Sequence, residues 1–141
     1  MNEIPQYCTF LLDGNLFGLE VGQVQEVLRG QTLTRVPLAP AVVRGLINLR
    51  GQIVTAIDLR RRLQMPPRDE LIEAMNIVVR TEEGTMSFLV DEIGDVIEVE
   101  ESAFEKPPET LHGVGRELVR GAYKLKSKLL LVLNTDVLMK L

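Results

Sequence analysis

The chain has 141 residues, of which 45% are hydrophobic and 26% charged, a composition typical of one globular domain or of two small fused ones. Its 16 basic and 20 acidic side chains give a net charge of −4, which is unfavourable for a protein that binds its partner by neutralising phosphates. Cys8 is the only cysteine, so an internal disulfide and a multi-cysteine metal cluster are both excluded.

Two β-hairpins are predicted in the first half of the chain. Short runs of aromatic and aliphatic residues at 7–12 and 16–21 flank Asp13-Gly14-Asn15, whose residue types tolerate the positive φ angles of tight turns. A second pair of apolar runs, at 45–49 and 53–57, flanks an Arg-Gly turn. Both patterns are typical of antiparallel strands joined by a short loop.

The same two hairpins are predicted again in the second half. One spans 77–81 and 85–90 around a Glu-Glu-Gly turn, with side chains that alternate in polarity, and the other spans 121–125 and 129–133. Residues 65–69, which include two consecutive prolines, are the predicted connector between the halves, because proline removes backbone donors and breaks helices.

The two halves also share the order of their turns and apolar positions. Residues 44–58 align with 120–134 at a constant offset of 76. The segments end in Asp58 and Asn134, which are both favourable N-cap residues for the short helical turns expected after them. Each half is therefore predicted to contain a hairpin, a short excursion, a second hairpin and a terminal helical turn.

These elements predict a mainly β fold with a few short helices. Regularly spaced short strands are typical of sandwiches and barrels, and no amphipathic segment is long enough for the crossover helix of a βαβ unit. We expect a single domain, 1–141, with two small barrels of about five strands each at 7–65 and 75–138. The pattern leaves open whether strands exchange between the barrels. Apolar surface that a thin barrel core cannot bury is expected to lie between the halves.

The charges are unevenly distributed. Residues 35–62 contain six arginines and one acid, whereas residues 91–105 contain seven acids and no basic residue. Such a separation suits electrostatic steering toward protein partners of defined charge. It is equally compatible with two ordinary solvated faces.

The sequence offers no residues from which to build a catalytic, cofactor or metal site. A zinc site needs several His, Cys or clustered carboxylate ligands, and Cys8 and His112 are the only residues of their kinds. We interpret Cys8 as a small packed residue of a strand and His112 as a loop residue. Gly113-Val114-Gly115 begins like a dinucleotide fingerprint, but position 118 is leucine and no parallel strand–helix unit surrounds it. We therefore predict a protein that is not an enzyme.

The sequence also carries expectations about location. Met1–Pro5 lacks the basic and apolar regions of a signal peptide, and the longest late apolar run, 129–133, is far shorter than a membrane span. We therefore expect a complete, cytoplasmic protein.

Two polar residues stand in rigid β settings. Arg50, in the turn of the second hairpin, can present a bidentate guanidinium to a carboxylate or to backbone carbonyls. Glu26 lies between Val24 and Val27, which share a face while Glu26 points elsewhere. Spacing alone does not distinguish a binding role for Glu26 and Arg50 from ordinary solvation.

Several of these segments together resemble the CheW family of chemotaxis coupling proteins. They are Phe17–Val21, Val24–Val27, Val43–Val54 with its Arg-Gly-x-x-Asn-Leu-Arg-Gly core, Ile57–Arg60, and the second-half segment Leu89–Val96. The resemblance covers nearly the whole chain. It implies two pseudo-symmetric, five-stranded SH3-like barrels and an adaptor without catalytic activity. Such an adaptor couples the regulatory domain of a CheA-type histidine kinase to the cytoplasmic tips of chemoreceptors.

The resemblance further implies a groove between the barrels that takes the receptor's helical hairpin. The family's apolar groove positions correspond here to Val24, Val27 and Val96, and more loosely to Met75. Its polar pair near that region corresponds to Glu26 and Arg50. A helical hairpin docks through apolar anchors. Val24 and Val27 on one side and Val96 on the other are expected to line opposite walls, since Val24 and Val96 align at an offset of 72.

Two other interpretations remain open at this point. A CheW-like regulator of a non-flagellar chemosensory pathway, for gliding, pili or development, would keep the mechanism and change the pathway. An SH3-like nucleic-acid-binding module would use Arg44, Arg50 and residues 60–62 to contact phosphates, although the net charge is against it. The coupling adaptor is expected to bind neither nucleic acid nor the membrane directly.

Overall fold

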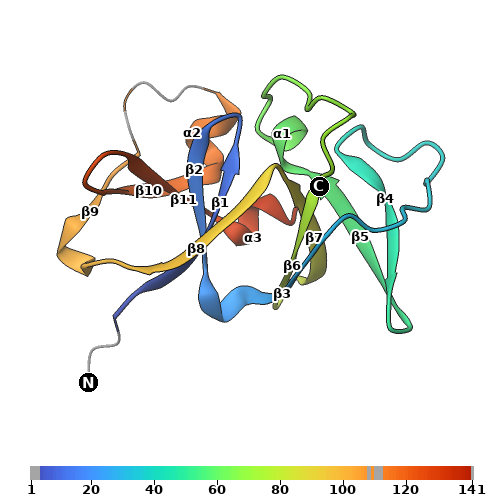
Figure 1. The fold of residues 1–141 in the computed structure, drawn as a ribbon, viewed down its shortest axis with the longest axis horizontal. Helices are drawn as coiled ribbons and strands as arrows, with labels where there is room; N and C mark the ends of the chain where they lie inside the picture. The colour runs from blue at the N-terminus through green and yellow to red at the C-terminus, as the bar shows by residue number, and fades with distance from the viewer. Residues whose placement is uncertain (1–3, 108, 110–112, 141) are drawn as a thin grey trace.

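The computed structural model describes residues 4–107, 109 and 113–140, which form two β-sheets lying side by side (Figure 1). Within these residues there are eleven strands, three short α-helices and two 3₁₀ helices, which confirms the prediction of a mainly β fold. No helix among them is both long and apolar enough to cross a membrane. His112, interpreted above as a loop residue, falls outside the described residues.

The first sheet has six strands in the order β8-β1-β2-β11-β10-β9. Its strands are β1 (Gln6–Leu12), β2 (Asn15–Glu20), β8 (Glu92–Glu98), β9 (Phe104–Glu105), β10 (Val119–Lys124) and β11 (Leu129–Leu133). The second sheet has five strands in the order β3-β6-β7-β5-β4. Its strands are β3 (Val24–Leu28), β4 (Val43–Leu49), β5 (Gln52–Asp58), β6 (Met75–Thr81) and β7 (Gly84–Val90). β3 and β8 are therefore edge strands.

All four predicted hairpins are confirmed. β1–β2, β4–β5, β6–β7 and β10–β11 are antiparallel pairs joined by short turns. At the first turn Asp13 and Gly14 both adopt positive φ, the conformation that these residue types tolerate. By contrast, the expected excursion after the first hairpin contains a strand, β3, and the acidic segment after the third hairpin contains another, β8.

The two sheets do not coincide with the two halves of the sequence. The chain leaves the six-stranded sheet after β2, builds the whole five-stranded sheet from β3 to β7, and returns at β8. Each sheet also joins two hairpins through a parallel pair, β2 with β11 and β5 with β7. Strands from residues 7–65 and from residues 75–138 therefore lie in both sheets.

The largest apolar cluster lies between the two sheets, and it draws residues from both halves of the sequence. Its fully buried members come from both sheets and include Phe10, Leu19, Ile57, Ile77 and Phe88. A smaller cluster around Tyr7 and Leu130 belongs to the six-stranded sheet, and another around Ile47 and Val78 belongs to the five-stranded sheet. Because burial of each large side chain contributes about 1.5–3 kcal/mol, the shared cluster is the main source of cohesion between the sheets.

Two predicted helix caps are present. Asp58 precedes α1 (Leu59–Arg62) and its carboxylate accepts hydrogen bonds from the backbone N–H groups of Arg60 and Arg61 at 3.0 and 3.4 Å. Asn134 precedes α3 (Thr135–Leu138), and its side chain accepts from Val137 N–H at 3.3 Å. The remaining short helices are η1 (Val21–Gln23), η2 (Glu101–Ala103) and α2 (Val114–Leu118).

Candidate functional site

A β-bulge in the edge strand β3 places Val24 and Val27 on the same face. The pairing of β3 with β6 shifts between Val24 and Glu26, so that Gln25 is an extra residue in β3. In a regular strand, residues three positions apart face opposite sides, and the bulge removes this alternation. Val27 lies opposite Ile77, whose side chain is buried in the cluster between the sheets.

The two valines differ in exposure. Val24 is half-buried and packs against the shared core, whereas 40% of Val27 is exposed. Val24 therefore holds the edge strand on the core, and Val27 presents apolar surface beyond it.

The edge strand β8 repeats this arrangement in the other sheet. Its pairing with β1 also contains a register shift, which leaves Ile93 opposite Phe10 and Val96 opposite Cys8. Ile93 packs against the shared core, and 56% of Val96 is exposed. Each edge strand thus carries one anchored and one exposed aliphatic residue, three positions apart.

The observed strand pairing shows which residues of the two halves are equivalent, and it differs from the alignment expected from the sequence. Phe10 and Val79 each lie three residues before the turn of a β-hairpin, and they face Ile93 and Val24, respectively. Val24 therefore corresponds to Ile93 at an offset of 69, and Val27 to Val96. The expected match of Val24 with Val96 is wrong by three positions. Counting from the hairpin turns, instead of matching valines, would have found Ile93.

The structure distributes the four predicted groove residues over both sheets. Val24 and Val27 lie in β3, and Met75, half-buried against the shared core, begins the neighbouring strand β6. Val96 lies in β8, which belongs to the other sheet (Figure 1). None of the four lines either of two surface cavities, of about 610 and 550 Å³, at Gly30–Leu33 and at Phe104. The groove assignment stays a prediction.

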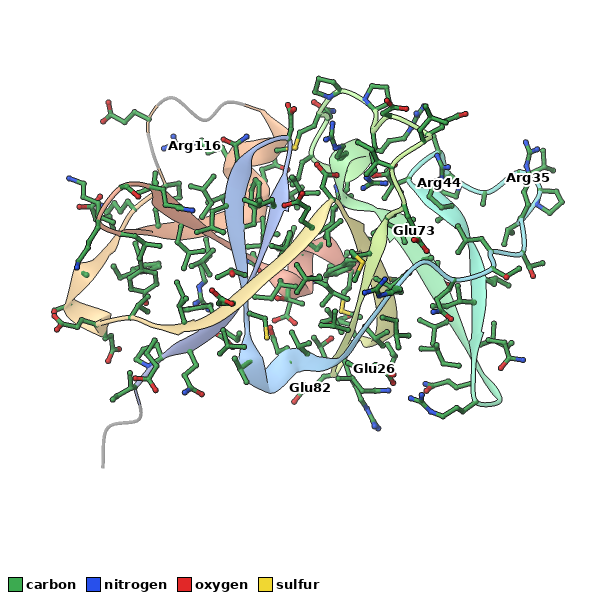
Figure 2. The ribbon with its side chains drawn as sticks, viewed as in Figure 1. Glu26, Arg35, Arg44, Glu73, Glu82 and Arg116 are labelled. Atoms are coloured by element: carbon green, nitrogen blue, oxygen red, sulfur yellow. The ribbon has the colours of Figure 1, made fainter. Side chains whose placement is uncertain are left out.

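The two predicted polar residues form an ion pair. Arg50, in the β4–β5 turn, donates from Nη2 to Oε2 of Glu26 in β3. The hydrogen bond from Arg50 lowers the pKa of the Glu26 carboxyl, and the same bond raises the pKa of Arg50. Figure 2 shows Glu26 at the opposite end of the five-stranded sheet from Arg44. Since β3 and β4 end the strand order, this contact requires the sheet to curl.

Comparison with known proteins identifies the family. Residues 6–141 match the CheW-like domain. The chain belongs to the CheW-like domain family. This membership confirms the resemblance seen in the sequence and the expectation of a protein that is not an enzyme.

Individual relatives cover nearly the whole chain. The chemotaxis protein CheW of Bacillus subtilis (strain 168) is 31% identical over 130 residues, which cover 92% of this chain and 83% of that protein. The chemotaxis protein CheW of Treponema pallidum (strain Nichols) is 29% identical over 135 residues, covering 92% and 78%. The crystal structure of the scaffolding protein TtCheW from Thermoanaerobacter tengcongensis matches with a TM-score of 0.88 at 27% identity, covering 99% and 94%.

Three of the arginines considered for phosphate binding contact the domain's own residues. Arg50 is paired with Glu26, and Arg60 with Asp91. Arg62 donates from Nη2 to the backbone carbonyls of Val137 and Lys140, at 3.2 and 3.1 Å. Arg60 and Arg62, two of the five arginines that a nucleic-acid-binding module would use, are thus held by internal contacts, and this interpretation loses support.

The residues considered for chemistry do not assemble into a reactive site. In the part of the chain that the structure describes, no three His, Cys, Asp or Glu side chains are grouped so that they could hold a metal ion. Cys8 lies half-buried in β1, and burial raises the pKa of its thiol, which disfavours the reactive thiolate.

Proposed function

We propose that this CheW-like domain is a non-enzymatic adaptor that couples a CheA-type histidine kinase to the cytoplasmic tips of chemoreceptors. In this proposal a receptor's helical hairpin docks in a groove bordered by β3 and β8, and other surfaces of the sheets bind the kinase's regulatory domain. Family membership and the likeness to a scaffolding protein support the adaptor role.

The observation that carries the groove proposal is the paired exposure of Val27 and Val96. Both are large apolar side chains left exposed on edge strands, at corresponding positions of the two sheets, beside the shared core. A helical hairpin offers apolar side chains along two antiparallel helices, and two matched apolar positions suit such a ligand. In this proposal three half-buried residues pack between the groove and the shared core: Val24, Ile93 and Met75.

We further propose that each sheet closes as an SH3-like barrel, so that the domain consists of two pseudo-symmetric barrels with exchanged strands. Two contacts support closure of the five-stranded sheet: the Glu26–Arg50 ion pair, and a bridge between Thr34 and Leu46 that lays the segment after β3 beside β4. Each sheet also has a small apolar cluster of its own.

Glu26 and Arg50 are proposed as the polar coupling residues. Their pair lies at the tip of the five-stranded sheet, where 70% of the Arg50 side chain remains exposed. The guanidinium is thus oriented by Glu26 while donors remain free for a partner's carboxylate or backbone carbonyl.

The groove is tested by titrating a receptor-tip helical hairpin into the wild-type protein and the Val27→Asp and Val96→Asp variants. Each variant is expected to bind about tenfold more weakly, because a charge in an apolar contact loses about 1.4 kcal/mol or more. Leu71→Asp is the matched control, since Leu71 is 93% exposed and lies in the segment between α1 and β6. Unchanged affinity in folded Val27 and Val96 variants would refute the groove.

The pathway is a separate question. A regulator of gliding, pili or development would keep this groove and differ in its kinase and receptor. Pull-down with candidate kinases and receptors from each pathway distinguishes the two, because the cognate pair is retained and the others are not.

A further inference from the structure

A cluster of charged groups surrounds Asp91, the single residue between β7 and β8. The carboxylate accepts from Arg60 Nε at 2.9 and 3.1 Å and from Arg60 Nη2 at 2.5 Å. It also accepts from Arg68 Nε at 2.9 Å and from the backbone N–H of Asp13 at 2.9 Å. We call Asp91, Arg60, Arg68 and the Asp13 N–H the Asp91 cluster. Its three side chains are between 10 and 14% exposed.

The Asp91 cluster connects parts of both sheets at the point where the chain crosses between them. β7 belongs to the five-stranded sheet, and β8 to the six-stranded sheet. Arg60 lies in α1 directly after β5, and Arg68 lies in the connector before β6. Asp13 lies in the β1–β2 turn, and the Asp91 N–H donates to Leu11 O in β1 at 3.1 Å. Asp91 is therefore held from both sheets.

The Asp91 cluster lies directly before the point where β8 begins to pair. Glu92 is opposite Leu11, so the register of β8 on β1 starts one residue after Asp91. Because side chains alternate along a strand, a slip of one residue turns every side chain to the other face. Such a slip would move Ile93 off the core and turn Val96 away from its present side.

We propose that Asp91 is a positioning residue for the groove: it pins the start of β8 and thereby sets the register in which Ile93 and Val96 face the partner. The receptor-binding consequence rests on the proposed function, whereas the pinning of β8 does not. Asp91 itself makes no contact with the partner in this proposal.

Cys8 provides a readout that needs no partner. It is the only cysteine, and it lies in β1 directly opposite Val96 of β8. Loosening or slipping of β8 uncovers its thiol. We expect Asp91→Asn to raise the rate of Cys8 alkylation by iodoacetamide several-fold under native conditions, and Arg68→Gln, which leaves Arg60 in place, to have a smaller effect of the same sign.

Two variants serve as controls. Glu92→Gln removes the same charge one residue later, at an exposed side chain without an ion pair among the described residues. Val54→Ala destabilises the small core of the five-stranded sheet, a cluster that includes no residue of β8. Both are expected to keep the wild-type alkylation rate. If Asp91→Asn also keeps it, or if Val54→Ala raises it equally, the pinning of β8 is overturned. Should Asp91→Asn not fold, the comparison of Arg68→Gln with the same controls decides.

The second measurement is the affinity of the receptor hairpin for Asp91→Asn, expected to fall about tenfold, within the usual range of coupling between two sites. A variant with fast alkylation and wild-type affinity would overturn the role of Asp91 in the groove. If the wild-type protein itself binds no hairpin, the proposed function is wrong. The alkylation rates still test whether Asp91 fixes the start of β8, because they need no partner.

Discussion

The two crossings between the sheets differ in how they are stabilised. From β2 to β3 the chain passes through η1, which has no side-chain cap and no buried residue. From β7 to β8 it passes through Asp91 alone, with two arginines and a backbone N–H on the carboxylate. The counterpart of Asp91 at the offset of 69 is Gly22, which has no side chain for such contacts. A bulged edge strand is therefore present in both halves of the chain, as β3 and β8. The contacts of an acidic side chain directly before the strand are found at β8 and not at β3.

β3 is instead held at its middle residue, by the ion pair of Glu26 with Arg50. The corresponding residues of the second half are Asp95 and Lys126, at offsets of 69 and 76, and the charges are therefore repeated. The ion pairs of the described residues include Glu26–Arg50 but none between Asp95 and Lys126. Both edge strands thus have polar attachments, at different places. β8 follows the Asp91 contacts and also accepts hydrogen bonds from Thr9 and Gln6 of β1, whereas β3 has the Glu26–Arg50 ion pair. Removing Asp91 or the Glu26–Arg50 pair tests the comparison.

Loss of Asp91 is expected to have the largest effect on stability. Asp91→Asn leaves the little-exposed guanidinium groups of Arg60 and Arg68 without their carboxylate, which costs about 3 kcal/mol of unfolding free energy. Urea unfolding measures this loss, with Asp95→Asn as the matched control expected to change little. Equal losses in the two variants would show that the contacts of Asp91 do not stabilise the β7–β8 crossing.

Each edge strand has one half-buried aliphatic residue that should matter for stability and one exposed aliphatic residue that should matter for binding. Val24→Asp places a charge against the shared core and is expected to cost about 2 kcal/mol, whereas Val27→Asp is expected to cost far less. Ile93→Asp and Val96→Asp should repeat this contrast in thermal unfolding. If the aspartate at the exposed position, 27 or 96, lowered stability more than the aspartate at the half-buried position of the same strand, the correspondence between β3 and β8 would be contradicted.

Low pH should reduce the contribution of the Asp91 carboxylate to the unfolding free energy. Burial alone would raise the pKa of Asp91, but hydrogen bonds from Arg60, from the Asp13 N–H and from Arg68, with the charge of Arg60, hold it below its ordinary value of 3.8. The unfolded chain therefore takes up this proton first as pH falls. The stabilisation is present above the ordinary pKa and is lost as pH falls toward the folded value. Unfolding free energy measured from about pH 5 to 3 should fall less steeply in Asp91→Asn than in the wild type.

The smallest effect on stability is expected at Arg50, where the reversal Arg50→Glu removes a pair that is largely exposed. Its urea midpoint should match the wild type, while kinase activation in a reconstituted receptor–kinase mixture should fall. Lys126→Glu, at the corresponding turn, is the control expected to keep activation. Activation that survives Arg50→Glu would make Arg50 an ordinary surface residue.

The features that the sequence predicts correctly depend on residues that are close together in the chain. The four hairpins and the Asp58 and Asn134 caps depend on residue types within a few positions of one another. The two edge strands are harder to predict because their bulges break the alternation by which strands are recognised, and because they expose valine where a core pattern expects burial.

The contacts at the site depend on distances that a sequence does not show. Glu26 and Arg50 are singled out by residue type and family resemblance, but their ion pair follows from the curl of the five-stranded sheet. Asp91 belongs to an acidic run that suggests a solvated face, yet its partners Arg60 and Arg68 lie 31 and 23 positions away. Ile93 is missed because valine was matched with valine across a register shift.

In the proposed function, β3 and β8 border one binding site. This arrangement is tested most directly by placing a photo-crosslinking residue at position 27, 96 or 71 and irradiating each protein with a receptor-tip hairpin. We predict crosslinks from positions 27 and 96 to the same hairpin and none from position 71. Crosslinks from only one edge strand, or equal crosslinking from position 71, would contradict the claim.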